Sequence, residues 1–358
     1  MPALYNLLEP AGLIRHFQEC PPEGFSSLSL DSGAPAFSAP FDLLTTVEPA
    51  IRRTLDALPV WSRLRHLRRP ETGFIGTTVS EYALLPSATT PESLVEGLLS
   101  ALAPRYAFLI IKDIPTEGAL VGEAALAFSR RLADFCGERG FVLMEGQALA
   151  YVPIDFASTE EFLGRLSHAR RKNVRRKLRS SVHLEIEAVC TGDERFRDDA
   201  LLAKFYELYL NVYHQSEIHF DLLTPDFFRA VLRDPGLDGI VFTYRVAGQL
   251  IGYNLCFCQD EALVDKFVGF VYPQARDFNL YVISWFHNIE YALAHGLRYY
   301  VAGWTDPEIK RDLGATLTFT QHAVYVRNPV LRAILIPIKR FFEADHRWQE
   351  SHVARSHS

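Results

Sequence analysis

The chain has 358 residues, 48% hydrophobic and 22% charged, so two globular domains are expected and not a disordered or fibrous protein. Its net charge of −6 argues against non-specific coating of DNA, and its five cysteines lack the spacing of a zinc site or a disulfide framework. The cysteine spacing therefore predicts no metal site. Neither a secretion signal nor a long apolar stretch is visible, which favours a cytoplasmic protein.

The first 150 residues contain few well-marked elements. Residues 1–40 mix Pro, Gly and Ser with short apolar pieces and are expected to form an irregular arm. Apolar spacing predicts a helix over 47–67, a strand over 106–111, a helix over 122–138 and a strand over 141–152. We therefore expect a first domain over residues 41–150.

The second half has longer elements with clearer ends. Ser158 and Glu161 have the spacing of a capping box, which predicts a helix from there to residue 179. The elements expected after it are a strand over 182–189, helices over 198–214 and from 225, strands over 239–246, 250–258 and 262–271, a helix over 278–295, a strand over 297–302, a helix over 307–312 and a strand over 316–327. They predict an α/β (α+β) domain over residues 151–328, followed by a C-terminal helix and tail over 329–358.

This element order resembles the GNAT acyltransferase fold, and the chain looks like its FemAB-like branch, in which two GNAT-type domains are fused in tandem. The resemblance rests on the Arg-rich residues 166–176, on residues 291–300, and on Lys-Arg-Asp-Leu-Gly-Ala over 310–315. It implies a mixed central sheet flanked by helices and a degenerate first domain. It also implies transfer of an acyl group to an amine beside strands that splay apart, near Tyr253 and Leu297.

The usual donor-phosphate loop of the GNAT fold is missing. Its pattern is Arg/Gln-x-x-Gly-x-Gly/Ala, whose glycines let backbone N–H groups approach phosphates at a helix N-terminus. Here that place reads Gln-Ala-Arg-Asp-Phe-Asn over 274–279, without glycine. The helix N-terminus with Gln274, Arg276 and Asn279 is still expected to receive an anion, with acyl-CoA as co-substrate and no permanently bound cofactor.

One segment is strongly basic: eight Lys or Arg residues and no acid lie between Arg165 and Arg179. Like charges at helical spacing repel one another, so a polyanionic partner is expected: the phosphates of CoA, the backbone of aminoacyl-tRNA, or an anionic lipid surface. Arg171 and Arg175 are the candidates for donor binding. The alternative is a solvated helix face balanced by acids elsewhere in the fold.

Polar residues interrupt the apolar strands of the predicted meander. Adjacent strand residues point to opposite faces, so Asp265 is a candidate for deprotonating an acceptor amine and Lys266 for meeting a donor phosphate or carboxylate. An internal ion pair or an edge position is the alternative, because a central charge is costly unless it is paired or functional. Tyr253 and Asn254 lie where the resemblance places groups near the reacting carbonyl; buried core polar groups are the alternative.

The loop over residues 213–221 contains two His, one Glu and one Asp. Glu217 and His219 are the preferred bases, because such groups accept a proton near neutral pH, and Tyr213 is a candidate for acceptor binding. A solvated loop is the alternative. Trp304 and Lys310 follow the carboxyl end of a predicted strand, where α/β sites gather, and are further candidates for substrate binding.

Three functions are compatible with these features. The leading hypothesis is an N-acyltransferase that passes an acyl group from acyl-CoA or another thioester to an amine of a small molecule or of a cell-envelope or natural-product precursor. An aminoacyl-tRNA-dependent, Fem-like transferase gains support from the missing glycine loop and the basic helix. A catalytically inactive GNAT-like binding module is the third. The apolar residues 330–342 are expected to pack on the protein, with weak contact to a membrane surface as the alternative.

Overall fold

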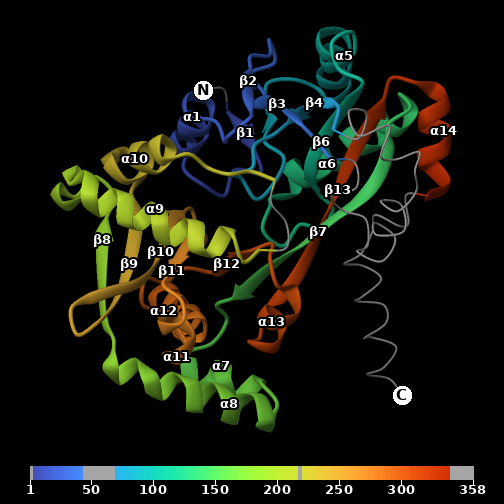
Figure 1. Cartoon of the computed structure of the whole chain (residues 1–358). Coiled ribbons are helices and arrows are strands. Elements are labelled where there is room, and N and C mark those ends of the chain that lie inside the picture. Colours follow the sequence, from blue (N-terminus) through green and yellow to red (C-terminus); the bar gives the residue numbers. More distant parts are fainter. Residues whose placement is uncertain (1–2, 43–68, 217–219, 339–358) are drawn as a thin grey trace, which may run out of the picture. The chain divides into compact units, whose positions relative to one another are not determined.

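The computed structural model describes residues 3–42, 69–216 and 220–338 and divides into two compact units (Figure 1). The first unit comprises Met1–Leu7, Gly24–Ala148 and Thr318–Ser358, and the second comprises Leu8–Glu23 and Leu149–Leu317. The predicted helix over 47–67 lies outside the described residues, as do Glu217 and His219. Each unit therefore combines segments that are far apart in the sequence.

The first unit is a mixed sheet with strand order β2-β3-β4-β6-β13-β7. Strands β2 to β4 form an antiparallel meander, β4 and β6 are parallel, and β13 is antiparallel to β6. Helices α5 and α6 pack on each other, and Leu94, Leu98 and Leu102 of α5 face the core at helical spacing. The elements are β1 (Leu4–Tyr5), β2 (Ser26–Leu28), β3 (Ala36–Pro40), β4 (Glu71–Ile75), β5 (Leu85–Pro86), α5 (Pro91–Leu102), β6 (Phe108–Pro115), α6 (Glu123–Glu138), β7 (Val142–Pro153), β13 (Thr316–Val326) and α14 (Pro329–Ile338).

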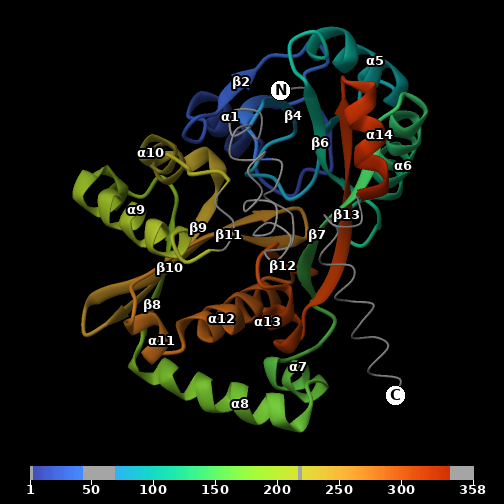
Figure 2. The same cartoon turned by 45° about the vertical axis from the view of Figure 1, so that its right-hand side comes forward.

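The second unit has the strand order β7-β12-β11-β10-β9-β8. Strands β8 to β11 are antiparallel to one another, and β11 and β12 are parallel. Figure 2 shows α9 and α10 on one side of these strands and α11 and α12 on the other. The elements are α1 (Ala11–Glu19), α7 (Thr159–Arg165), α8 (His168–Leu178), β8 (Glu185–Cys190), α9 (Asp199–Tyr213), α10 (Pro225–Arg233), β9 (Gly239–Val246), β10 (Gln249–Gln259), β11 (Ala262–Phe270), α11 (Gln274–Asp277), α12 (Leu280–Ala294), β12 (Tyr299–Gly303) and α13 (Pro307–Asp312).

The predicted fold class, a mixed central sheet flanked by helices, is confirmed in both units. The helix predicted from Ser158 to residue 179 is broken in two. Leu166 is extended, and the Ser167 hydroxyl accepts the N–H of Arg170, so α8 begins as a new helix after α7. Asn279 has a φ of 55°, in the left-handed region, which separates α11 from α12.

The prediction of an irregular arm over residues 1–40 is wrong. Leu13, Ile14 and Phe17 of α1 are fully buried in the second unit, whereas β2 and β3 belong to the first. Sequence reasoning missed α1 because it has only nine residues and no side-chain cap at Pro10. The predicted extent of the second domain is also wrong at its end, because β13 pairs with β6 of the first unit.

The parallel strands β11 and β12 stay together for only a short distance. Their pairing runs from Ala262 opposite Tyr299 to Val264 opposite Val301, while β11 continues to Phe270. The strands that part are therefore β11 and β12, and Tyr253 lies on β10, one strand further away. Within the described residues, no helix is long and apolar enough to cross a membrane.

Candidate active site

Asp265 is the first residue of β11 beyond the part that pairs with β12. Asn254 of β10 donates from Nδ2 to both carboxylate oxygens, at 3.0 Å to Oδ1 and 2.8 Å to Oδ2. Asn288 of α12 donates to Oδ2 at 2.9 Å, and the Tyr300 hydroxyl of β12 donates to Oδ2 at 3.2 Å. The side chains of three elements thus converge on one carboxylate, and Asp265 as a whole residue has intermediate exposure.

Burial dominates the electrostatics of this carboxylate. It raises the pKa of Asp265 to about 6, although hydrogen bonds from Asn254 and Tyr300 and the charge of Lys310 favour the ionised form. The Cys256 thiol also lies near, with Sγ at 3.6 Å from Oδ1, and its burial raises its pKa well above the ordinary value. Asp265 is consequently ionised at neutral pH yet able to accept a proton, whereas Cys256 stays protonated.

A β-bulge beside Asp265 determines how the neighbouring side chains point. Leu255 pairs with Phe267 and Cys256 pairs with Asp265, so the strand register passes over Lys266. Bulges re-aim side chains and recur next to active sites. The side chain of Lys266 is only 6% exposed and pairs with the fully buried Glu9 at 3.2 Å. Lys266 thus forms the internal ion pair that was the alternative to its predicted role with a donor phosphate or carboxylate.

Lys310 fixes the end of β12. The residue is 5% exposed, and its Nζ donates to the carbonyls of Ala302 at 2.6 Å and Gly303 at 3.1 Å. Gly303 has a φ of 80°, a left-handed conformation that glycine adopts at little cost. Trp304 follows directly and is partly buried. Of the predicted substrate-binding residues, the structure brings Asn254 and Lys310 to the surroundings of Asp265.

Two other predicted site residues lie elsewhere in the second unit. Tyr253 is fully buried, with its ring 4.5 Å from that of Phe205, and it fills the space left by Gly269 on the neighbouring strand. It is a core residue. Tyr213 ends α9, and its ring lies 6.0 Å from the ring of Tyr209 in a tilted arrangement.

Acidic residues balance part of the basic segment over residues 165–179. This agrees in part with the alternative interpretation, a solvated helix face whose charge is balanced by acids elsewhere in the fold. Three of its eight cations pair with carboxylates: Arg165 with Asp155, Arg170 with Asp312, and Arg175 with Glu160. Arg171 donates to the Gly164 carbonyl at 3.3 Å. In the described part of the chain, five cations of this segment have no carboxylate partner: Arg171, Lys172, Arg176, Lys177 and Arg179. A cationic surface therefore remains on α8.

The end of α8 lies beside the start of α12. The Asn279 amide donates to the Ser180 hydroxyl at 3.3 Å, and the rings of His183 and Phe278 are 6.5 Å apart. Gln274 begins α11. Arg276 donates to Gln215 at 2.9 Å and lies 5.0 Å from the Tyr272 ring. The predicted donor-binding residues 274–279 thus lie next to the C-terminal end of the basic helix.

Sequence reasoning missed Asn288 and Tyr300. Asn288 is completely buried on α12, next to Ile289 and one turn from Trp285 and Ala292. A single amide in this apolar stripe was the available signal, because a buried amide needs a partner. Tyr300 gave no signal, since aromatic residues are common in strands. Among the described residues, no group of three or more His, Cys, Asp or Glu side chains is placed to hold a metal ion.

A protein-family comparison matches residues 113–357 to the FemAB-like family, described as peptidoglycan biosynthesis/recognition. The chain belongs to this family. The predicted resemblance to the FemAB-like branch of the GNAT fold is thereby confirmed. The family is of the transferase type, which supports the general prediction that the protein is an acyltransferase. No curated protein sequence matches the chain.

Three solved structures share the fold of this FemAB-like protein. The C-terminal domain of a protein assigned as a lysylphosphatidylglycerol synthetase from Agrobacterium fabrum has 12% identity and a TM-score of 0.55, covering 94% of this chain and 92% of that one. L-PGS from Bacillus licheniformis has 10% identity and a TM-score of 0.53, with coverages of 95% and 98%. FemX has 14% identity and a TM-score of 0.52, with coverages of 94% and 96%.

Proposed function

We propose that the second unit transfers an aminoacyl group from aminoacyl-tRNA to an amine of a peptidoglycan precursor, with Asp265 as the general base. The observation that carries this proposal is the position of Asp265. It is a buried, ionisable carboxylate held by Asn254, Asn288 and Tyr300, at the point where two parallel strands stop pairing. Perturbed acids at such positions are characteristic of catalytic sites. The acceptor class follows from the description of the family.

In the proposed reaction the acceptor amine attacks the ester carbonyl directly. A nitrogen–carbon bond forms, the bond from the carbonyl carbon to the tRNA oxygen breaks, and Asp265 takes the proton that the amine loses. The tRNA leaves as a free hydroxyl after gaining a proton. A pKa of about 6 suits this role. The carboxylate is mostly ionised at neutral pH, and it is a stronger base than an aspartate with the ordinary pKa of 3.8.

The surrounding side chains would act as positioning residues. The amides of Asn254 and Asn288 hold both oxygens of the carboxylate, and Tyr300, which packs edge-on against Trp285 at 5.2 Å, adds a third donor. Lys310 would hold the turn at Ala302 and Gly303 in place. The high pKa of Cys256 speaks against an acyl-cysteine intermediate, because the thiolate is the nucleophilic form.

The tRNA is favoured over CoA by the shape of the cationic surface. The α8 cations without carboxylate partners lie between Arg171 and Lys177, with Arg179 just beyond the helix, and a helix rises about 1.5 Å per residue, so the segment offers positive charge over the length of a few phosphates. CoA would be expected to use a glycine-rich loop at a helix N-terminus, and residues 274–279 have no glycine. Acyl-CoA remains the competing donor.

The experiment supplies three donors to the full chain, with amine-bearing peptidoglycan precursors as acceptors: aminoacyl-tRNA, acetyl-CoA and a long-chain acyl-CoA. We expect transfer only from aminoacyl-tRNA, inhibition by uncharged tRNA, and affinity that falls steeply with salt. Transfer from either CoA ester alone would refute the proposed donor. Absence of transfer and of binding with every donor would instead favour the inactive binding module.

A further inference from the structure

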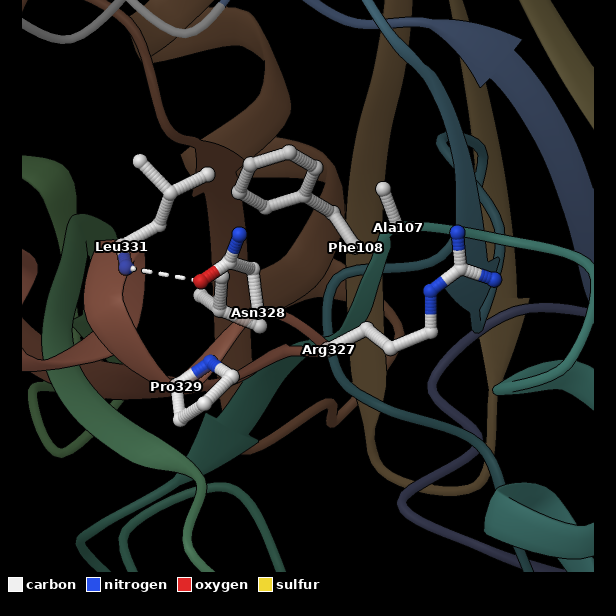
Figure 3. Close-up of a pocket in the computed structure, with 7 residues that line it drawn as sticks. Ala107, Phe108, Arg327, Asn328, Pro329 and Leu331 are labelled. Carbon is white, nitrogen blue, oxygen red and sulfur yellow. Dashed lines mark hydrogen bonds between the residues drawn. The ribbon is translucent and has the colours of Figure 1, made fainter.

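An apolar surface is exposed at the start of α14 in the first unit. Val330 is 66% exposed and Leu331 49%, which makes them two of the four exposed large hydrophobic residues in the described part of the chain. Asn328 fixes the start of the helix, because its side-chain oxygen accepts the N–H group of Val330 at 2.9 Å and that of Leu331 at 3.3 Å; Figure 3 shows the bond to Leu331. Both apolar side chains are therefore held at the surface by a formed helix.

A pocket of about 460 Å³ lies directly beside these residues (Figure 3). Its walls come from the start of β6, the end of β13 and the first turn of α14, and they include Ala107, Phe108, Val326 and Leu331. The lining is mainly apolar, with the exception of Arg327 and Asn328. An apolar hollow next to exposed aliphatic side chains can receive a hydrocarbon chain.

Three arginines surround this surface, and within the described ranges none has a carboxylate partner. Arg327 donates to the carbonyls of Ala103 at 3.3 Å and Pro104 at 2.9 Å. Arg332 lies 5.9 Å from the Tyr325 ring and donates to the Gly140 carbonyl, and Arg105 lies 5.5 Å from the Tyr106 ring. Their positive charge is not neutralised by acids, in contrast to Arg131 and Arg139 of the same unit, which pair with glutamates.

We propose that this surface, comprising Arg105, the apolar pocket, Arg327 and the first turn of α14, docks on an anionic membrane. The aliphatic side chains of Val330 and Leu331 enter the lipid interface, and the arginines meet lipid phosphates. The sequence over residues 327–342 is also basic and apolar, because it contains four Arg or Lys residues and no acid. The inference is independent of the donor and of the chemistry proposed for the second unit.

Charge and shape favour a membrane over a protein partner. An acidic protein would satisfy the arginines but would have to present apolar groups that fit both the pocket and the helix. An anionic bilayer offers phosphates and acyl chains together, without a matching shape. A basic and aliphatic edge without acids is the composition of interfacial segments that bind anionic lipids.

The test is sedimentation of the full chain with vesicles of phosphatidylcholine alone or mixed equally with phosphatidylglycerol. We expect binding to the mixed vesicles only. The double variant Val330→Glu/Leu331→Glu is expected to lower the partition coefficient more than about ten-fold, and Arg105→Gln to lower it about five-fold. Val182→Glu is the matched control, since Val182 is 80% exposed but lies in the second unit, and it should bind like the unchanged protein.

Several outcomes would overturn the proposal. They are absence of binding to the mixed vesicles, unchanged binding by the double variant, or equal binding to both vesicle types. Loss of binding in Val182→Glu would place the membrane contact near α8 instead. A dimer that the double variant converts to a monomer, without vesicle binding by either, would identify the surface as a protein interface. Circular dichroism and thermal unfolding verify that each variant is folded.

Discussion

The Asp265 carboxylate combines two opposing effects. Burial disfavours its charge, and the donors Asn254, Asn288 and Tyr300 stabilise that charge. The outcome is a base whose pKa is close enough to neutrality to take part in proton transfer. Because of this balance, the loss of any one of these donors should change the pKa of Asp265.

Replacing Asp265 by Asn tests its role as the base. We expect kcat to fall about 100-fold or more, because the amide cannot accept the proton. In the unchanged protein kcat/KM should rise through pH 6 as the carboxylate ionises, and the residual activity of Asp265→Asn should lack this limb. A variant with the same profile as the unchanged protein would show that another group is the base.

The raised pKa of Asp265 should make the folded protein less stable as the pH rises from about 4 to 7. The folded-state pKa of about 6 lies above the ordinary 3.8, so between these values the folded chain holds a proton that the unfolded chain has lost. The stabilisation is complete below pH 3.8 and disappears as the pH rises through 6. Urea unfolding from pH 4 to 7 should therefore show a smaller decline for Asp265→Asn than for the unchanged protein.

Replacing Tyr300 by Phe removes one donor to the carboxylate without removing the ring. The pKa of Asp265 should then rise by up to about one unit, since a hydrogen bond to the charged form is lost. The acid limb of the kcat/KM profile should move to higher pH. Tyr253→Phe is the control, because this hydroxyl is also buried but has no hydrogen-bond partner among the residues that the structure describes. Equal shifts in both variants would contradict the role of Tyr300.

At the scale of elements, the second half of the fold could be predicted well because its helices and strands are long and end at recognisable residues. The predicted strands over 239–246, 250–258 and 262–271 differ from β9, β10 and β11 by no more than one residue at any end. The break at Ser167 could not be predicted, because Leu166 continues the apolar stripe of a single helix. The Asp265 cluster was only partly predictable, since the β-bulge and the pairing partners depend on contacts distant in the sequence.

The cationic surface of α8 predicts a specific salt dependence. The triple variant Lys172→Gln/Arg176→Gln/Lys177→Gln removes cations without carboxylate partners, so the slope of log K against log salt for tRNA should fall by about one per charge removed. The matched control changes Arg165, Arg170 and Arg175 to Gln, which alters the net charge equally but removes cations already paired with acids. Filter binding over a series of salt concentrations measures both. Equal changes in slope would mean that only net charge matters.

At the scale of the whole molecule, the units are built from interleaved parts of the sequence. The second unit includes the N-terminal residues Leu8–Glu23, and the first includes β13 near the other end. Glu9 and Lys266 join two such segments in the interior of the second unit, at 3.2 Å with side-chain exposures of 0% and 6%. Separate segments therefore depend on each other for stability.

The Glu9→Gln variant should lower the free energy of unfolding by about 3 kcal/mol, because it leaves the Lys266 charge buried without its counterion. The double variant Glu9→Leu/Lys266→Met should recover most of this loss, since neither charge remains. Glu19→Gln is the control at the end of α1, the helix that follows Glu9, where the side chain is exposed, and should change stability by less than about 0.5 kcal/mol. Urea unfolding compares the three, and a loss that the double variant fails to recover would show that the charge is not its cause.

The predicted domain boundaries suggest that residues 151–328 could be produced alone, and the structure indicates that this fragment will not fold cooperatively. It lacks α1 and Glu9, so Lys266 and the surface under Leu13, Ile14 and Phe17 become exposed. It also retains β13 without β6, which leaves an unpaired strand. Thermal unfolding should show no cooperative transition for the fragment alone, whereas co-expression with residues 1–150 should restore one, because that piece supplies both α1 and β6. A cooperative transition in the isolated fragment would mean that these segments are dispensable for the second unit.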